Sequence, residues 1–289
     1  MENVYMPVRQ EISPIVYMKQ TKLFTTSMML PPNRDENKAE IAMQYIRFYG
    51  MNLNKISKHM ISSRLEEYEK NHHDTDKDEI AKIMYSVFRH DDSFVKSNGI
   101  IIKTHVIYTK YPGQGEHISL PRTRLKDIKY TPWEESDFCD FVTNYEFLFL
   151  VFKNDVDDEK TRQNKNTYLS CVIYLKFNEG EIAEAHRVYD LTQQRIWEGV
   201  KQWALRNKDG SIRMCPVNKE RPVMGNNLPN ASESEIFHVR PHADSKVQEE
   251  LENGDKINGQ SFWINREYLR KYIDDNRVHS LFEGEGYAE

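Results

Sequence analysis

The sequence lacks most of the patterns that identify secreted proteins, membrane proteins and the common enzyme families. It has only 3 cysteines in 289 residues, and Cys139, Cys171 and Cys215 are too far apart for the paired spacing of a zinc site. No apolar run is long enough to span a bilayer, and the start "MENVYMPVRQ" does not resemble a signal peptide. Glycine-rich phosphate loops, GxSxG and HExxH are absent too. We therefore expect a cytoplasmic protein with reduced thiols and no membrane partner.

Charge is nearly balanced in total but uneven along the chain. The net charge of -5 argues weakly against a nucleic-acid partner. Residues 96–130 and 201–246 are nevertheless rich in lysine and arginine, whereas residues 132–160 are rich in aspartate and glutamate. Two interpretations stay open: a basic face that binds a polyanion, or ordinary solvated loops. Charge alone favours the loops.

Periodicity predicts a mixed α/β protein with an irregular arm at 1–34 and one domain over 35–289. Pro31 and Pro32 end the arm, and apolar residues then recur first at helical and later at strand spacing. The predicted helices cover 35–49, Leu53 to Met60, Ile80 to Phe88, a long segment through Ile196, Val200, Trp203 and Ala204, and 266–275. The predicted strands cover 100–110, 145–153, 167–177, 236–240 and 260–265.

The stretch "SNGIIIKTH" contains a strand in which Ile101 and Lys103 lie side by side on one face. In nucleases of the PD-(D/E)xK type, the position two residues before such a lysine is acidic. The acid binds Mg²⁺, and the lysine polarises the attacking water or the phosphate. Isoleucine cannot bind a metal, so this stretch taken alone favours a core strand that contains a lysine.

The stretch "FHVRPHADSK" supplies three candidates for contact with DNA. Arg240 carries a guanidinium fork suited to a phosphate or a guanine edge. Pro241 ends the strand, so His242 and Lys246 are expected in a loop. The alternative is a surface ion pair beside an exposed histidine.

The stretch "HISLPRTRLKDI" supplies three more candidates for contact with DNA. Arg122, Arg124 and Lys126 occupy alternate positions, from which they could follow a phosphate backbone. The alternative is a solvated edge strand whose charges discourage aggregation.

Five stretches together resemble a known family: "SNGIIIKTHVIY", "ISLPRTRLKDIKYTPWEESDF", "YEFLFLVFK", "FHVRPHADSK" and "GQSFWINREYL". In this order they resemble the MutH-like type II restriction endonucleases that act at GATC, over about residues 35–275. The pair "HVRPH" and "QSFWIN" is the most specific part. The resemblance is strongest to the C-terminal half of the two-domain members.

The resemblance implies a PD-(D/E)xK fold, with a mixed central sheet flanked by helices that forms a cleft over duplex DNA. In the family, the N-terminal half cuts with Mg²⁺, and the C-terminal half binds a second site as an allosteric effector. The catalytic lysine corresponds to Lys103, but the strand acid corresponds to Ile101 and the loop acid to about Phe94. The DNA-contacting segments correspond to Arg240 and His242 and, less specifically, to the residues Ser261 and Trp263.

Three hypotheses follow, and the sequence leaves open whether the chain is an enzyme. The first is a double-stranded DNA-binding effector domain without a metal or cofactor, acting with a catalytic nuclease domain or subunit. In it, Arg240 and His242 read bases, and Lys103, Arg122, Arg124, Lys126 and Lys246 contact phosphates. The second is an active Mg²⁺-dependent endonuclease whose acids have moved to Asp91, Asp92 or Glu79. The third is a protein-interaction scaffold that no longer binds DNA.

Overall fold

The structure is a computed structural model that describes residues 36–71, 79–87, 95, 97–108, 117–154, 166–215, 220–241 and 248–276. The chain divides into two compact units. The first unit comprises residues 1–115, 147–175 and 273–289, and the second comprises residues 116–146 and 176–272. The predicted arm at 1–34 lies outside the described residues, and the single domain over 35–289 stays a prediction.

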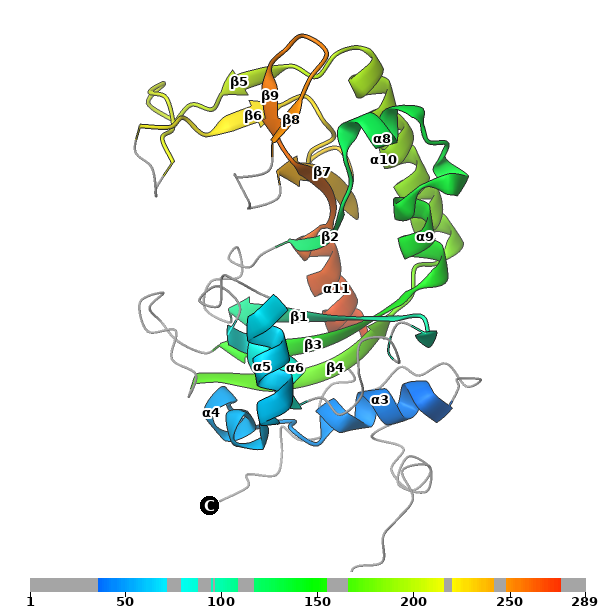
Figure 1. The fold of residues 1–289 in the computed structure, drawn as a ribbon, viewed down its shortest axis with the longest axis vertical. Coiled ribbons are helices and arrows are strands. Elements are labelled where there is room, and N and C mark those ends of the chain that lie inside the picture. Colours follow the sequence, from blue (N-terminus) through cyan, green and yellow to red (C-terminus); the bar gives the residue numbers. More distant parts are fainter. Residues whose placement is uncertain are drawn as a thin grey trace, which may run out of the picture. The chain divides into compact units, whose positions relative to one another are not determined.

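Among its described residues, the first unit has four helices and a short 3-10 turn packed beside a sheet of order β1-β3-β4, in which β3 and β4 are antiparallel (Figure 1). Its elements are α3 (Glu36–Ile46), α4 (Leu53–Ile56), η1 (Ser57–His59), α5 (Ser62–Asn71), α6 (Glu79–Val87), β1 (Ile100–Tyr108), β3 (Glu146–Asn154) and β4 (Thr167–Leu175). Gly50, at φ +72°, separates α3 from α4, because this backbone conformation is open mainly to glycine. The Asn52 side chain then caps α4 by accepting the Lys55 N–H at 3.0 Å.

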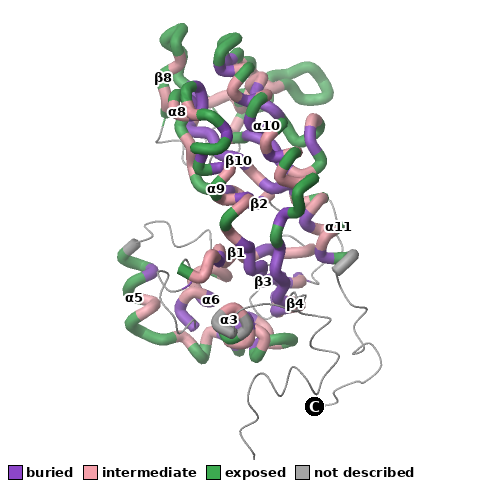
Figure 2. Tube along the Cα trace, turned by 90° about the vertical axis from the view of Figure 1, so that its right-hand side faces the viewer, coloured by how far each residue is buried: buried purple, intermediate pink, exposed green. Residues whose placement is uncertain are grey.

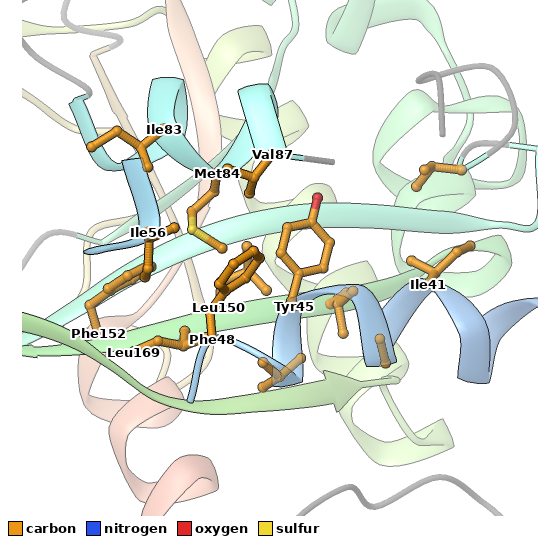
Figure 3. Close-up of a cluster of buried hydrophobic side chains, with 14 of the residues drawn as sticks. Ile41, Tyr45, Phe48, Ile56, Ile83, Met84, Val87, Leu150, Phe152 and Leu169 are labelled. Carbon is orange, nitrogen blue, oxygen red and sulfur yellow. The ribbon is translucent and has the colours of Figure 1, made fainter. Parts of the chain in front are cut away.

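The core of the first unit lies between its helices and one face of the sheet (Figure 3). Ile100, Ile102 and Val106 of β1 pack against this cluster, so alternate side chains of the strand share the core face. The central strand β3 is buried on both faces, and the buried stretch can be followed along β3 and β4 in Figure 2. Each large apolar side chain buried in this way contributes roughly 1.5–3 kcal/mol.

The second unit contains an antiparallel sheet of order β2-β10-β7, two smaller β-pairs, β5-β6 and β8-β9, and several helices. Its strands are β2 (Ile118–Arg122), β5 (Gln202–Ala204), β6 (Met224–Asn226), β7 (Phe237–Pro241), β8 (Gln248–Glu250), β9 (Lys256–Asn258) and β10 (Gln260–Ile264). Its helices are α8 (Leu125–Tyr130), η3 (Trp133–Glu135), α9 (Asp137–Asn144), α10 (Glu179–Trp197) and most of α11 (Arg266–Asn276).

Aromatic side chains join one face of the β2-β10-β7 sheet to α9 and α10. Phe262 of β10 stacks on Phe138 of α9 with ring centroids 4.0 Å apart, and Tyr189 of α10 lies 6.0 Å from Phe262. Phe237 of β7 contacts Phe138 edge to face at 5.4 Å. One face of the sheet is therefore packed against α9 and α10, and the opposite face is left for polar residues.

The mixed α/β class, with a central sheet flanked by helices, is confirmed. One predicted helix is partly wrong. The helix α10 ends at Trp197, and Gly199 then adopts φ +92°, which turns the chain out of the helix. Trp203 and Ala204 therefore lie in β5, although their spacing from Ile196 fits a helix. Within the described part of the chain, no helix has the length and apolar character needed to span a membrane.

Candidate nucleic-acid interface

A β-bulge in β2 decides the direction of Arg122. Ser261 of β10 lies opposite Arg122, whereas Trp263, two residues later, lies opposite Ser119, so β2 has one extra residue in this stretch. Without that residue, strict alternation would turn Arg122 to the same face as the buried Leu120. The bulge instead places Arg122 on the face opposite the apolar core.

Two arginines flank one serine across this sheet. Ser261 pairs with Arg122 on one side and with Arg240 of β7 on the other, and directly paired residues of antiparallel strands share a face. Ser261 is only 2% exposed, whereas Arg240 is exposed. We name the face that carries Arg122, Ser261, Arg240 and Trp263 the arginine face; it gathers four of the residues predicted to contact DNA.

Trp263 orients Arg240. The guanidinium carbon of Arg240 lies 5.0 Å from the centroid of the Trp263 ring, within the range of a cation–π interaction. The indole Nε1 of Trp263 also donates a hydrogen bond to the Arg240 carbonyl at 3.3 Å. The guanidinium is therefore held over a rigid ring and keeps its exposure to solvent, an arrangement suited to a planar or anionic ligand.

Gly259 and Glu249 surround Arg122. The Arg122 guanidinium lies directly against Gly259, where the Cβ of any other residue would overlap it. Glu249 of β8 accepts the Leu125 N–H at 2.7 Å at the start of α8. Burial raises the pKa of the Glu249 carboxyl, and this hydrogen bond and the attraction of Arg122 partly offset the effect. Arg122 is therefore fixed by its surroundings more firmly than a solvated arginine.

Two histidines also lie on this side of the sheet. His238 pairs with Trp263, and its ring contacts that of His117 with centroids 4.5 Å apart. Burial, helped by His117 and Arg240, lowers the pKa of His238 to about 3. Burial and Arg240 also lower the pKa of His117. Both imidazoles are thus neutral at pH 7, and the positive charge of the face comes from its arginines. Sequence reasoning did not assign these two histidines to the site, although the alternation of His238 with Arg240 was visible.

Arg124 and Lys126 do not continue the strand. The strand β2 ends at Arg122, and α8 begins at Leu125, so the predicted alternation of three cations stops after the first. Arg124 instead forms an ion pair with Asp127, from Nε to Oδ2 at 2.7 Å, while Lys126 is exposed on α8. Asp127 also raises the pKa of Arg124 through that hydrogen bond. Arg124 therefore brings less net positive charge to a ligand than its sequence position indicated.

Lys103 belongs to the first unit, on the β1 face that also carries Ile101 and His105. His105 is buried, and burial lowers its pKa to about 4. Mg²⁺ is bound in proteins mainly by oxygen ligands, and no carboxylate occurs on β1. The strand β1 therefore supplies no carboxylate ligand for Mg²⁺, and the described ranges contain no metal-binding group of three or more His, Cys, Asp or Glu residues.

Five further residues named in the hypotheses lie outside the described residues. They are His242 and Lys246 of the predicted loop after β7, and Asp91, Asp92 and Phe94 before β1. Their proposed roles stay predictions.

Comparison with known proteins gives one informative relative. No family model matches the chain. Over 210 residues the chain is 25% identical to the type II restriction enzyme Sau3AI of Staphylococcus aureus, a region that covers 64% of this chain and 40% of that enzyme. The matched region thus spans less than half the length of its relative. The likeness supports a relationship to type II restriction enzymes.

Proposed function

We propose that this chain is a sequence-specific double-stranded DNA-binding domain of a type II restriction system, that it recognises GATC or a similar short site, and that it acts as an effector without cutting DNA itself. A catalytic nuclease domain or subunit would be its partner. MutH-like ancestry and a degenerate PD-(D/E)xK core are part of this proposal. The likeness to a type II restriction enzyme supports the DNA-binding part.

The observation that carries the proposal is the arginine face. Arg240 is exposed and held over Trp263, and Arg122 lies in the same cross-strand row. A guanidinium fork forms two parallel hydrogen bonds with O6 and N7 of guanine, or with a phosphate. We assign base reading to Arg240, together with His242 of the following loop. We assign a phosphate contact to Arg122 on the arginine face. The same role is assigned, from their positive charge alone, to Lys103, Arg124, Lys126 and Lys246.

The residue that corresponds to the strand acid of the resembled family favours binding without cleavage. An isoleucine at position 101 removes a carboxylate from the side of Lys103. Losing a carboxylate also removes a negative charge that would repel DNA phosphates. Lys103 is accordingly assigned as a phosphate contact and not as a catalyst.

The direct experiment compares a GATC duplex with a scrambled duplex in gel-shift titrations at several salt concentrations. Replacing Arg240 by alanine should reduce the preference for GATC by roughly 1–3 kcal/mol if the side chain reads a guanine. Arg187→Ala is the matched control, because it removes the same charge from an arginine that Glu184 binds at 2.7 Å elsewhere in the second unit. An equal preference in wild type and Arg240→Ala would contradict base reading by Arg240. No salt-dependent binding by the wild type would favour the scaffold hypothesis.

A second candidate function is an active Mg²⁺-dependent endonuclease with relocated acids. The retained Lys103 and the likeness to a restriction enzyme favour it. Plasmid nicking with Mg²⁺ that is abolished by Lys103→Ala would establish this candidate in place of the effector.

A further inference from the structure

Within the segment 201–226, which we name the basic ribbon, the described residues 201–215 and 220–226 form a narrow β-structure in the second unit. Strands β5 and β6 pair from Gln202↔Asn226 to Ala204↔Met224 (yellow-green and yellow in Figure 1). Isolated bridges extend the pairing, from Arg206 to Ile212 and from Met214 to Pro222. Backbone hydrogen bonds also join Leu205, Arg213 and Val223 across three segments of the ribbon, so its described part is a defined structural element of the unit.

The basic ribbon has the opposite charge to the rest of the chain. Residues 201–226 contain six lysines and arginines against two acids, a net charge of +4. Since the whole chain carries -5, the remaining residues together carry -9. A positive segment on a protein of net negative charge attracts polyanions locally.

The cations of the ribbon also differ from other cations of the second unit in how they are paired. Outside the ribbon, several cations bind acids directly: Arg124–Asp127, Lys129–Glu252, Arg187–Glu184, Arg195–Glu233 and Arg266–Glu267. In the ribbon, Lys201, Lys208 and Arg213 are exposed, and none of them has an acidic partner among the described residues. Their charge is therefore available to a ligand.

Exposed apolar side chains accompany these cations. Ile212, Met214 and Met224 are 46%, 39% and 41% exposed. The pairing places them on one face of the ribbon, because Ile212 and Met214 are two residues apart and Pro222, the partner of Met214, is two residues before Met224. The same alternation turns Arg213, which lies between Ile212 and Met214, to the opposite face. A contact with phosphates would therefore rest on the exposed cations and not on these apolar side chains.

Side-chain hydrogen bonds attach the ribbon to the arginine-face sheet. The Gln202 Nε2 donates to the Lys256 carbonyl at 3.2 Å, and the Arg221 Nη2 donates to the Asn258 Oδ1 at 3.0 Å. Both acceptors belong to β9, which continues through Gly259 into β10. A ligand bound on the arginine face and one on the ribbon would therefore be held by directly connected strands.

We propose that the basic ribbon binds the phosphate backbone of the duplex that flanks the recognised site, through Lys201, Lys208 and Arg213. This inference rests on the proposed DNA-binding function. It assigns affinity for any duplex to the ribbon, and discrimination between base sequences to the arginine face. A sequence-independent contact of this kind contributes to every duplex in proportion to the counterions it releases.

The experiment uses the full chain with Lys201, Lys208 and Arg213 all changed to glutamine. Dissociation constants are measured over a series of NaCl concentrations for a GATC duplex and a scrambled duplex of equal length. The salt slope is the steepness with which the logarithm of the binding constant falls as the logarithm of the salt concentration rises. Each lost phosphate contact reduces this slope by about 0.9, so the triple variant should lose roughly 2–3 units of slope on both duplexes. The ratio of the two affinities should stay within about 2-fold of the wild-type ratio, because no base contact is removed.

The matched control changes Lys55, Lys58 and Lys70 to glutamine, which removes the same charge from exposed positions of the first unit. This control should keep the wild-type slope. A triple ribbon variant with the wild-type slope would overturn the ribbon proposal while leaving the arginine face intact. Equal wild-type affinity for both duplexes, with a slope that falls in the ribbon variant, would instead overturn site recognition and keep the ribbon. Loss of self-association in the ribbon variant, with unchanged DNA binding, would assign the surface to a second copy of the chain and also overturn the proposal.

Discussion

The two three-stranded sheets of this protein use their faces differently. In the first unit, the middle strand β3 is apolar and buried on both faces, and the adjacent β1 carries Lys103 beside an isoleucine. In the second unit, the middle strand β10 alternates: Phe262 packs on aromatic rings, while Ser261 and Trp263 lie on the arginine face. The comparison teaches that the strand that resembles a nuclease strand packs one face against the core, whereas β10 carries the face for which recognition is proposed.

The largest expected effect comes from removing the Phe262 ring, which packs the sheet under the arginine face against α9. Phe262→Ala should destabilise the second unit by roughly 3–5 kcal/mol and abolish the preference for GATC, because the sheet loses its packing against α9. Urea unfolding measures the stability, and gel shift measures the preference.

Phe152→Ala is the matched control in the first unit, since Phe152 is also fully buried. It should cost a similar free energy of unfolding but leave the preference unchanged at temperatures where the protein is folded. If both variants lost the preference equally, the assignment of recognition to the second unit would fail.

A smaller effect is expected from acid. Burial lowers the pKa of His238 to about 3 and of His105 to about 4, from 6.5 in the unfolded chain. At pH values between the folded and the unfolded pKa, the unfolded chain binds more protons than the folded chain. The free energy of unfolding is therefore fully present above pH 6.5 and falls as the pH is lowered. From pH 7 to pH 5, each histidine should cost about 1–2 kcal/mol, seen as a lower urea midpoint.

His238→Phe should remove about half of that pH dependence, and His59→Gln, a change at an exposed histidine, serves as the control. A His238 variant as sensitive to pH as the wild type would show that the buried imidazole is not the group responsible.

Gly259→Ala should act through Arg122. The new Cβ would overlap the Arg122 guanidinium, which is the far end of a long side chain and can move to another rotamer, so the protein should stay folded with the arginine displaced. We expect the salt slope of DNA binding to fall by about 0.9. The double variant with Arg122→Ala should bind no more weakly than Arg122→Ala alone, since both changes remove one interaction. Additive losses in this cycle would place the effect of Gly259 elsewhere.

The smallest effect is expected at Lys103. Lys103→Ala should weaken binding to all duplexes equally, with a slope change of at most about 0.9, and leave the preference for GATC unchanged. Titrations on GATC and scrambled duplexes test this, with Lys55→Gln as an exposed lysine control in the same unit. A loss of preference would give β1 a share in recognition.

Much of this arrangement follows from periodicity, and the exceptions have physical causes. Alternation was sufficient to place Ile101 and Lys103 on one face of β1, with Ile100, Ile102 and Val106 on the other face, which packs against the core cluster. It was insufficient for Arg122, because a β-bulge shifts the register by one residue. The spacing of Ile196 and Trp203 fits a helix, but the backbone turn at Gly199 overrides it. The pairing of Arg124 with Asp127 depends on where α8 begins, which an isolated charge pattern does not specify.

Hydrogen exchange with and without DNA tests the central claim most directly. A GATC duplex, compared with a scrambled duplex at the same salt concentration, should slow amide exchange in β7 and β10 around Arg240 and Trp263, and should leave β1 around Lys103 nearly unchanged. Protection confined to β1, or equal protection of β7 and β10 by both duplexes, would contradict the assignment of sequence recognition to the arginine face.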